Sequence, residues 1–144
     1  YSDCQWWLEW YTDTGATAAT ATVAVTYNDG TTGSLTGISL AATRRASFLQ
    51  PLNGLIPAAA AGKFIRAVNT VTLSVSTGTA GNFGVTVTRP RVSLGCPVAN
   101  IKWSADWAAL PLGEIPNSAC LFPLVIAGST TTGTIRGNGK LAHG

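Results

Sequence analysis

Acidic side chains are the first group in this sequence that could do chemistry. The chain has six of them: Asp3, Glu9, Asp13, Asp29, Asp106 and Glu114. Glycoside hydrolysis needs two carboxylates across a cleft, and Glu9, which lies among tryptophans, could form such a pair with Glu114 or Asp106. The spacing does not require that arrangement, because Asp29 lies in a turn segment and Glu114 precedes "IPN" in a loop segment. We therefore expect no catalytic residues and no enzyme activity.

Nucleophilic and metal-binding side chains are also few. His143 is the only histidine, so a Ser or Cys nucleophile would have no second histidine as its base. We expect each of the three cysteines, Cys4, Cys96 and Cys120, to be a buried free thiol, and one disulfide among them remains open. The sequence has no D-x-D-x-D run, and its glycine-rich stretches "GTAGNFG" and "GNG" match no phosphate loop. We expect no bound metal and no organic cofactor.

The stretch "DCQWWLEWYTD" concentrates aromatic residues near the start of the chain. Alternation places Trp6, Leu8 and Trp10 on one face of a strand, and Trp7, Glu9 and Tyr11 on the other. One set can enter a core, which leaves the other at a surface or beneath a connecting loop. Because an exposed aromatic face usually marks a partner, Trp7 and Tyr11 are candidate protein-interface residues.

Basic residues give a second candidate interface. The nine Lys and Arg produce a net charge of +3 but are spread along the chain, with local pairs only at "RR" (Arg44, Arg45) and "RPR" (Arg89, Arg91). Nucleic-acid binders cluster more positive charge than this, so we do not expect a nucleic-acid partner. Arg is enriched in protein interfaces, and we expect Arg89 and Arg91 to contact an acidic protein surface.

The elements that must position these residues are predicted to be strands. In "ATATVAVTY" (19–27) small and apolar residues alternate with threonine, which is typical of a half-buried strand. "NDG" should then form a tight turn into a return strand around "TTGSLTGISL" (31–40). A second hairpin is predicted from Val68–Thr77 and Asn82–Arg89 across the turn "GTAGN". Its core-facing residues would be Val71, Leu73, Val75, Val85 and Val87.

Further segments complete the predicted architecture. Strands are expected at Ala119–Ala127, despite Pro123, and around "TIRGNGKLA"; short helices are expected at Ala58–Phe64 and Ser104–Leu110. "QPLNGLIP" and "SLGCPVAN" are predicted to be surface connections. Several short strands separated by turns predict an all-β fold, an antiparallel β-sandwich, with a jelly roll as one form of it.

Length and composition set the domain organisation. The 144 residues suit one β-sandwich domain over 1–144, and charged residues make up 10% against a typical value of about 25%. No run approaches the roughly 20 apolar residues that span a bilayer, so no membrane partner is expected. The chain begins at Tyr1 without Met, and we expect it to be the C-terminal part of a longer protein.

Several stretches together resemble a known group of proteins. "YTDTGATAATATVAVTYNDGTTGSLTGISL", "RASFLQPLNGLIP", "VNTVTLSVSTGTAGNFGVTVTR", "EIPNSACL" and "GSTTTGTIRGNGKLAHG" resemble the C-terminal β-rich domain of tailed-bacteriophage virion proteins of the capsid-associated or decoration type. The resemblance implies a non-enzymatic structural component on the capsid surface of the virion. Its partners would be the major capsid protein, other virion proteins and further copies of itself. The alternative is a virion-displayed module that binds host-surface glycans through Trp7, Tyr11 or Trp107.

Overall fold

The structure, a computed structural model, describes residues 1–78, 81–95, 98, 101–102, 104–106 and 114–126. The chain divides into two compact units, Tyr1–Gly113 and Glu114–Gly144. All the strands of the described residues lie in the first unit. That a single sandwich domain takes up residues 1–144 stays a prediction.

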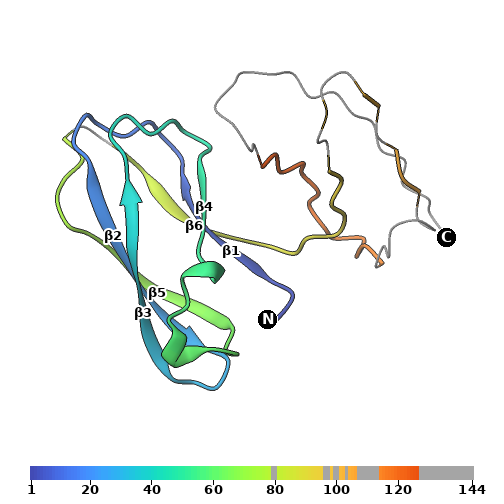
Figure 1. Cartoon of the computed structure of the whole chain (residues 1–144), viewed down its shortest axis with the longest axis horizontal. Coiled ribbons are helices and arrows are strands. Elements are labelled where there is room, and N and C mark those ends of the chain that lie inside the picture. The colour runs from blue at the N-terminus through green and yellow to red at the C-terminus, as the bar shows by residue number, and fades with distance from the viewer. Residues whose placement is uncertain (79–80, 96–97, 99–100, 103, 107–113, 127–144) are drawn as a thin grey trace. The chain divides into compact units, whose positions relative to one another are not determined.

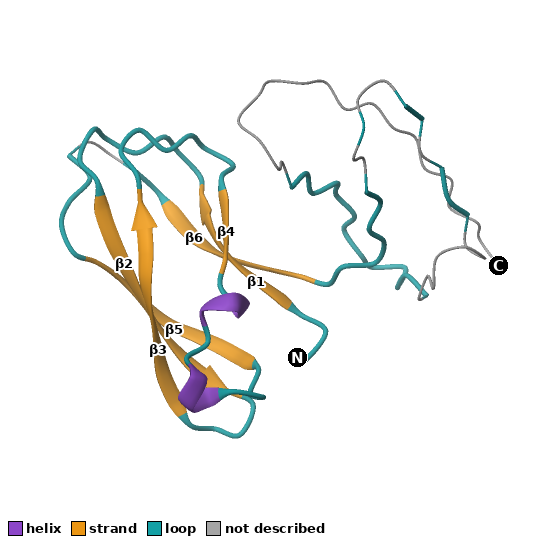
Figure 2. Cartoon of the chain, in the orientation of Figure 1, coloured by secondary structure: helices purple, strands orange, loops and turns teal. Residues whose placement is uncertain are grey.

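The first unit is built from six described strands in two antiparallel sheets (Figures 1 and 2). One sheet has the order β4-β1-β6 and the other the order β3-β2-β5. The bounds are β1 Gln5–Trp10, β2 Ala19–Tyr27, β3 Thr32–Leu40, β4 Leu49–Pro51, β5 Ile65–Leu73 and β6 Phe83–Thr88. Two 3-10 helices, η1 Asn53–Leu55 and η2 Ala58–Ala60, join β4 to β5. The predicted all-β, antiparallel sandwich is confirmed; a jelly roll, which has eight strands, stays a prediction.

The core lies between the two sheets and follows the alternation of β1 and β2. On β1, Trp6, Leu8 and Trp10 are at most 9% exposed, as their shared face predicts. The inward residues of β2 and β3 are buried against them: Ala19, Ala21, Val23, Val25, Tyr27, Leu35, Ile38 and Leu40. Thr20 and Thr22 are exposed on the outer face of β2, where β-branched side chains suit a pleated surface.

The hairpin of β2 and β3 is confirmed at its predicted turn. Gly30 has φ +85°, a conformation that glycine adopts without strain. The Asp29 carboxylate accepts hydrogen bonds from the Thr31 N–H (3.0 Å) and hydroxyl (2.6 Å), and Lys63 Nζ lies 2.8 Å from its other oxygen. The hydrogen bond from Lys63, followed by those from Thr31, holds the pKa of Asp29 well below its ordinary value. The carboxylate therefore ties this turn to the residues just before β5.

The second predicted hairpin is wrong, although both of its strands exist. β5 pairs with β2 in one sheet, and β6 pairs with β1 in the other. The chain between them crosses from sheet to sheet, held by bonds from Ser74 N to Thr20 O (2.8 Å) and from Thr17 N to Thr77 O (3.1 Å). Because alternation fixes the faces of a strand and not its neighbour, the same pattern fits both arrangements.

The inward residues predicted for that hairpin divide into two groups. Val71, Leu73 and Val85 are half-buried and pack against the core, as predicted. Val75 and Val87 are 50% and 46% exposed, so their predicted burial is wrong. Val75 lies beyond the end of β5, and Val87 lies on β6, an edge strand with no described strand beyond it.

The segment "QPLNGLIP" is more than a surface connection. It contains most of β4, which pairs with β1, and its Leu52 is fully buried in the core. Asn53 fixes this segment to β1: its Oδ1 accepts from Trp6 N (2.8 Å), and its Nδ2 donates to Cys4 O (2.9 Å). A part-buried polar bridge of this kind joins residues nearly fifty positions apart, which no local pattern indicates.

The remaining segment predictions have mixed outcomes. Of the helix predicted at Ala58–Phe64, only the three residues of η2 are helical. Residues 104–106 are not helical, and the rest of Ser104–Leu110 lies outside the described residues, as do "TIRGNGKLA" and parts of "SLGCPVAN". Among the described residues, no helix is long and apolar enough to cross a bilayer.

In the second unit, the described residues are 114–126, and they contain no strand. The strand predicted at Ala119–Ala127 is therefore absent over 119–126. A turn at Asn117 and Ser118 is closed by a bond from Ala119 N to Pro116 O (2.9 Å). Cys120 is a free thiol but exposed, whereas Cys4 in the first unit is free and buried as predicted; Cys96 lies outside the described residues.

Candidate functional site

The candidate interface residues of β1 lie on the outer face of the β4-β1-β6 sheet. The register of β1 and β6 is unbroken from Gln5 opposite Thr88 to Trp10 opposite Phe83. Trp7 lies opposite Thr86, and Glu9 lies opposite Gly84, so these four residues share the face that points away from the core. With Tyr11 and Thr88 they form a row of cross-strand contacts, which we call the outer-face ladder.

Each β1 side chain of the outer-face ladder leans toward the β6 residue diagonal to it. Trp7 Nε1 donates to Thr88 Oγ1 (2.8 Å), and the Thr86 hydroxyl donates to the Glu9 carboxylate. Tyr11 continues the series over Gly84, where an added Cβ would lie 2.8 Å from its ring carbons Cε2 and Cζ. A side chain at position 84 would displace the tyrosine ring, which occupies that space. Diagonal contacts of this kind stabilise a sheet much as i,i+4 pairs stabilise a helix.

The structure separates the two aromatic residues that were predicted to share the outer face of β1. Of the two outcomes left open for this face, surface or covered, Tyr11 takes the first with 54% exposure, and Trp7 takes the second with only 7%. Trp7 lies on the central strand of its sheet between Pro51 of β4 and Thr86 of β6, and its indole N–H is bonded to Thr88. These neighbours lie on both sides of the buried Trp7, and Tyr11 remains the accessible aromatic residue of the ladder.

The two candidate arginines follow β6 directly. Arg89 Nε lies 3.2 Å from Asp3 Oδ2, and both side chains are more than half exposed. The pKa of the Arg89 guanidinium is raised, first by a hydrogen bond with the Cys4 side chain and second by the negative charge of Asp3. Arg91, two residues further on, is half-buried. Arg89 thus has an acidic partner within its own chain, and the predicted contact of both arginines with another protein stays a prediction.

The acids considered for glycoside hydrolysis have different surroundings. Glu9 is bonded to Thr86 within the outer-face ladder, whereas Glu114 belongs to the second unit. Asp106 is exposed in the first unit. Among the residues that the structure describes, no three or more His, Cys, Asp or Glu side chains gather where they could hold a metal ion. His143 and Trp107 lie outside the described residues.

Sequence reasoning missed the β6 half of the ladder, namely Gly84, Thr86 and Thr88. A signal for it does exist, because the alternating pattern of "GVTVT" complements that of "WLEWY". The register that brings the two together depends on a pairing between residues some eighty positions apart, and no local feature indicates it.

Comparison of this chain with protein-family models, with curated proteins and with solved structures finds no match. The ladder contains two hydrogen-bonded side-chain pairs, Trp7 with Thr88 and Thr86 with Glu9, and ends in the exposed Tyr11.

Proposed function

We propose that this chain is a non-enzymatic structural component of a bacteriophage particle that binds and stabilises the exterior of the capsid. The resemblance of several stretches to tailed-phage virion proteins supports this role. The all-β sandwich and the low charged fraction of 10% also agree with a compact shell component.

The observation that carries the proposal is the set of large apolar side chains that remain exposed after β6. In the second unit, the side chains of five residues are 38–81% exposed: Leu121, Phe122, Leu124, Val125 and Ile126. In the first unit, four more are 51–55% exposed: Val92, Leu94, Val98 and Ile101. Large apolar side chains left exposed within either unit are candidates for contact with another protein, and a virion supplies such contacts in many copies.

On the sandwich itself, Tyr11 is the proposed anchor. Its ring is fixed over Gly84 at one end and exposed over about half of its surface, which suits an aromatic residue at the centre of an interface. Trp7 supports the sheet below this surface and is too well covered to be an anchor. The same exposed ring is the observation that favours the glycan-binding alternative, because tyrosine rings can also stack on sugars.

Sedimentation with purified particles of the encoding phage, with heads and tails separated, tests the proposal. The wild-type chain is expected to sediment with heads. Tyr11→Ala and Ile126→Asp are each expected to weaken binding. Truncating a buried anchor residue costs about 2 kcal/mol of binding free energy, which corresponds to roughly a 30-fold rise in Kd. Thr22→Ala, an exposed change on the other sheet, is the control that should bind normally.

Two outcomes would overturn the proposal. Wild-type protein that does not sediment with heads at micromolar concentration would exclude a capsid-binding role. Binding of the wild type to a host-surface glycan on an array, lost in Tyr11→Ala and unaffected by Ile126→Asp, would favour the host-binding module instead. Urea unfolding of each variant shows whether the fold survives the substitution.

A further inference from the structure

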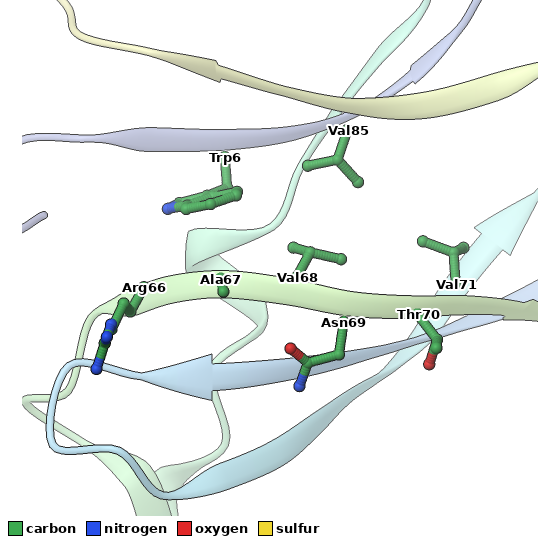
Figure 3. Close-up of a pocket in the computed structure, with 8 residues that line it drawn as sticks. All are labelled: Trp6, Arg66, Ala67, Val68, Asn69, Thr70, Val71 and Val85. Carbon is green, nitrogen blue, oxygen red and sulfur yellow. The ribbon is translucent and has the colours of Figure 1, made fainter.

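One flank of the sandwich is open along β5 and β6. Trp6 and Val85 point from one sheet toward Val68 and Val71 of the other, and a groove of about 450 Å³ lies between them (Figure 3). Val68, Val71 and Val85 are only half-buried, and Val87 next to them is 46% exposed. β4 is the other edge of the β4-β1-β6 sheet. Beside it, Leu52 and Ala60 from the connection between β4 and β5 are buried in the core.

β6 differs from the other edge strands of the described residues in having none of the usual protection against strand pairing. β4 has three residues and ends in proline, and β3 carries a bulge near Gly37, which has φ +75°. β5 carries two bulges, with Asn69 and Arg66 as the extra residues. β6 has a continuous register with β1 and neither charge nor proline from Phe83 to Thr88. Bulges, charges, prolines and short length are the devices by which edge strands avoid other strands.

No described strand pairs with the outer edge of β6, and the backbone groups on that edge lie on the same residues as its apolar side chains. Tyr11 N donates to Asn82 O, which makes these two opposite residues a hydrogen-bonded pair. Hydrogen-bonded pairs recur at every second residue of an antiparallel ladder, so the even-numbered residues of β6 point their N–H and C=O groups toward β1. Trp10 N donates to Phe48 O, which shows that the even-numbered β1 residues bond to the β4 side. Phe83, Val85 and Val87 therefore direct both their N–H and C=O groups outward from the sheet edge and their side chains toward the groove.

We propose that β6 pairs antiparallel with β6 of a second copy of this chain about a two-fold axis perpendicular to the sheet. With Val85 opposite Val85 of the second copy, Phe83 lies opposite Val87, and every outward backbone group meets a partner. A shift by one residue would place apolar side chains opposite threonines and is excluded by the alternation. The pairing joins two three-stranded sheets and merges the two open grooves, which covers Val87.

The charges flanking β6 agree with this antiparallel pairing. Arg89, the first charged residue after the strand, would lie opposite Gly81 of the second copy. The two Arg89 residues would be eight positions apart along the paired strands, about 26 Å at ~3.3 Å per residue, so their repulsion would be largely screened by salt. A parallel pairing would instead place the two arginines side by side. The β6 pairing does not depend on a role in a virion.

Sedimentation equilibrium of the whole chain tests the pairing. The wild type is expected to be a dimer at micromolar concentration, and Val87→Lys, which places a charge on the exposed edge valine, is expected to be a monomer. Val75→Lys is the matched control, since Val75 is a valine of similar exposure (50%) outside β6, and it should leave the dimer intact. A monomeric wild type, or a dimer that Val87→Lys does not weaken, would overturn the proposal.

Disulfide trapping keeps the test decisive if Val87→Lys does not fold. In a chain with Cys96 and Cys120 replaced by serine, Val85→Cys should oxidise to a covalent dimer, because opposed residues of a hydrogen-bonded pair have Cα atoms about 5.5 Å apart. Val87→Cys should not, because the two positions 87 would be about 13 Å apart at ~3.3 Å per residue. Equal trapping of both variants, or of neither, would exclude the two-fold register.

Discussion

Truncating Leu8 to alanine tests whether the two sheets share one core. Leu8 lies on β1, the central strand of its sheet, between Trp6 and Trp10 on the core face, and it is fully buried. Leu8→Ala removes roughly three methylene equivalents, or about 2.4 kcal/mol at ~0.8 kcal/mol each. The cavity left in a closed core adds to this, so we expect a total loss of about 3–5 kcal/mol in the free energy of unfolding.

Urea unfolding followed by tryptophan fluorescence measures this loss. Trp6 and Trp10 lie on the same face as Leu8 and report the opening of the core directly. The midpoint should fall while the dependence of the free energy on urea stays unchanged, because the surface exposed on unfolding is almost the same. A loss of this size is a large part of the roughly 5–15 kcal/mol that stabilises a typical domain.

Val75→Ala is the matched control for Leu8→Ala. Val75 is 50% exposed, so its truncation should cost less than about 1 kcal/mol, near the usual range for surface sites. The reasoning would be refuted by a Leu8→Ala cost below about 1 kcal/mol, the value expected of a surface residue. Equal costs for the two variants would likewise show that the core does not lie between β1 and β2.

Two further predictions concern Trp7 and Asp29. Trp7→Ala should lower the free energy of unfolding by about 3–5 kcal/mol, because it removes a buried indole, and Trp7→Phe should lower it less. An unchanged urea midpoint for Trp7→Ala would contradict the burial of Trp7. Because its pKa is lowered in the folded state, the Asp29 carboxylate stabilises the fold above its ordinary pKa of 3.8, and this stabilisation is lost as the pH falls below that value. The wild type should therefore melt at a higher temperature than Asp29→Asn at pH 7, and this difference in melting temperature should shrink toward pH 2. A difference in melting temperature that does not change with pH would contradict the ion pair with Lys63.

The sequence by itself determined the features that depend on neighbouring residues. Alternation in β2 defined which residues face the core, because successive side chains of a strand point to opposite faces. The β2–β3 hairpin followed from the "NDG" turn, since a tight turn leaves its two strands little choice but to pair. The same alternation correctly placed Trp6, Leu8 and Trp10 inside.

The tertiary structure decided which strands became neighbours. Alternation identified β5 and β6, but the longer connection between them allows either a hairpin or a crossing to the other sheet. β1 settles the choice, because it pairs with β6 over its full length. Pairing between residues about eighty positions apart depends on the packing of the whole core and leaves no mark in a short window of sequence.

The burial of Trp7 and the open flank beside β6 have the same origin. Alternation correctly placed Trp7 on the outer face, yet Trp7 is buried there, beside Pro51 and Thr88, which only the sheet register brings next to it. Val87 carries the inward pattern but is exposed, and it lies on β6 at the edge of its sheet. A sequence pattern gives the direction in which a side chain points, whereas burial depends on what other parts of the chain place in front of it.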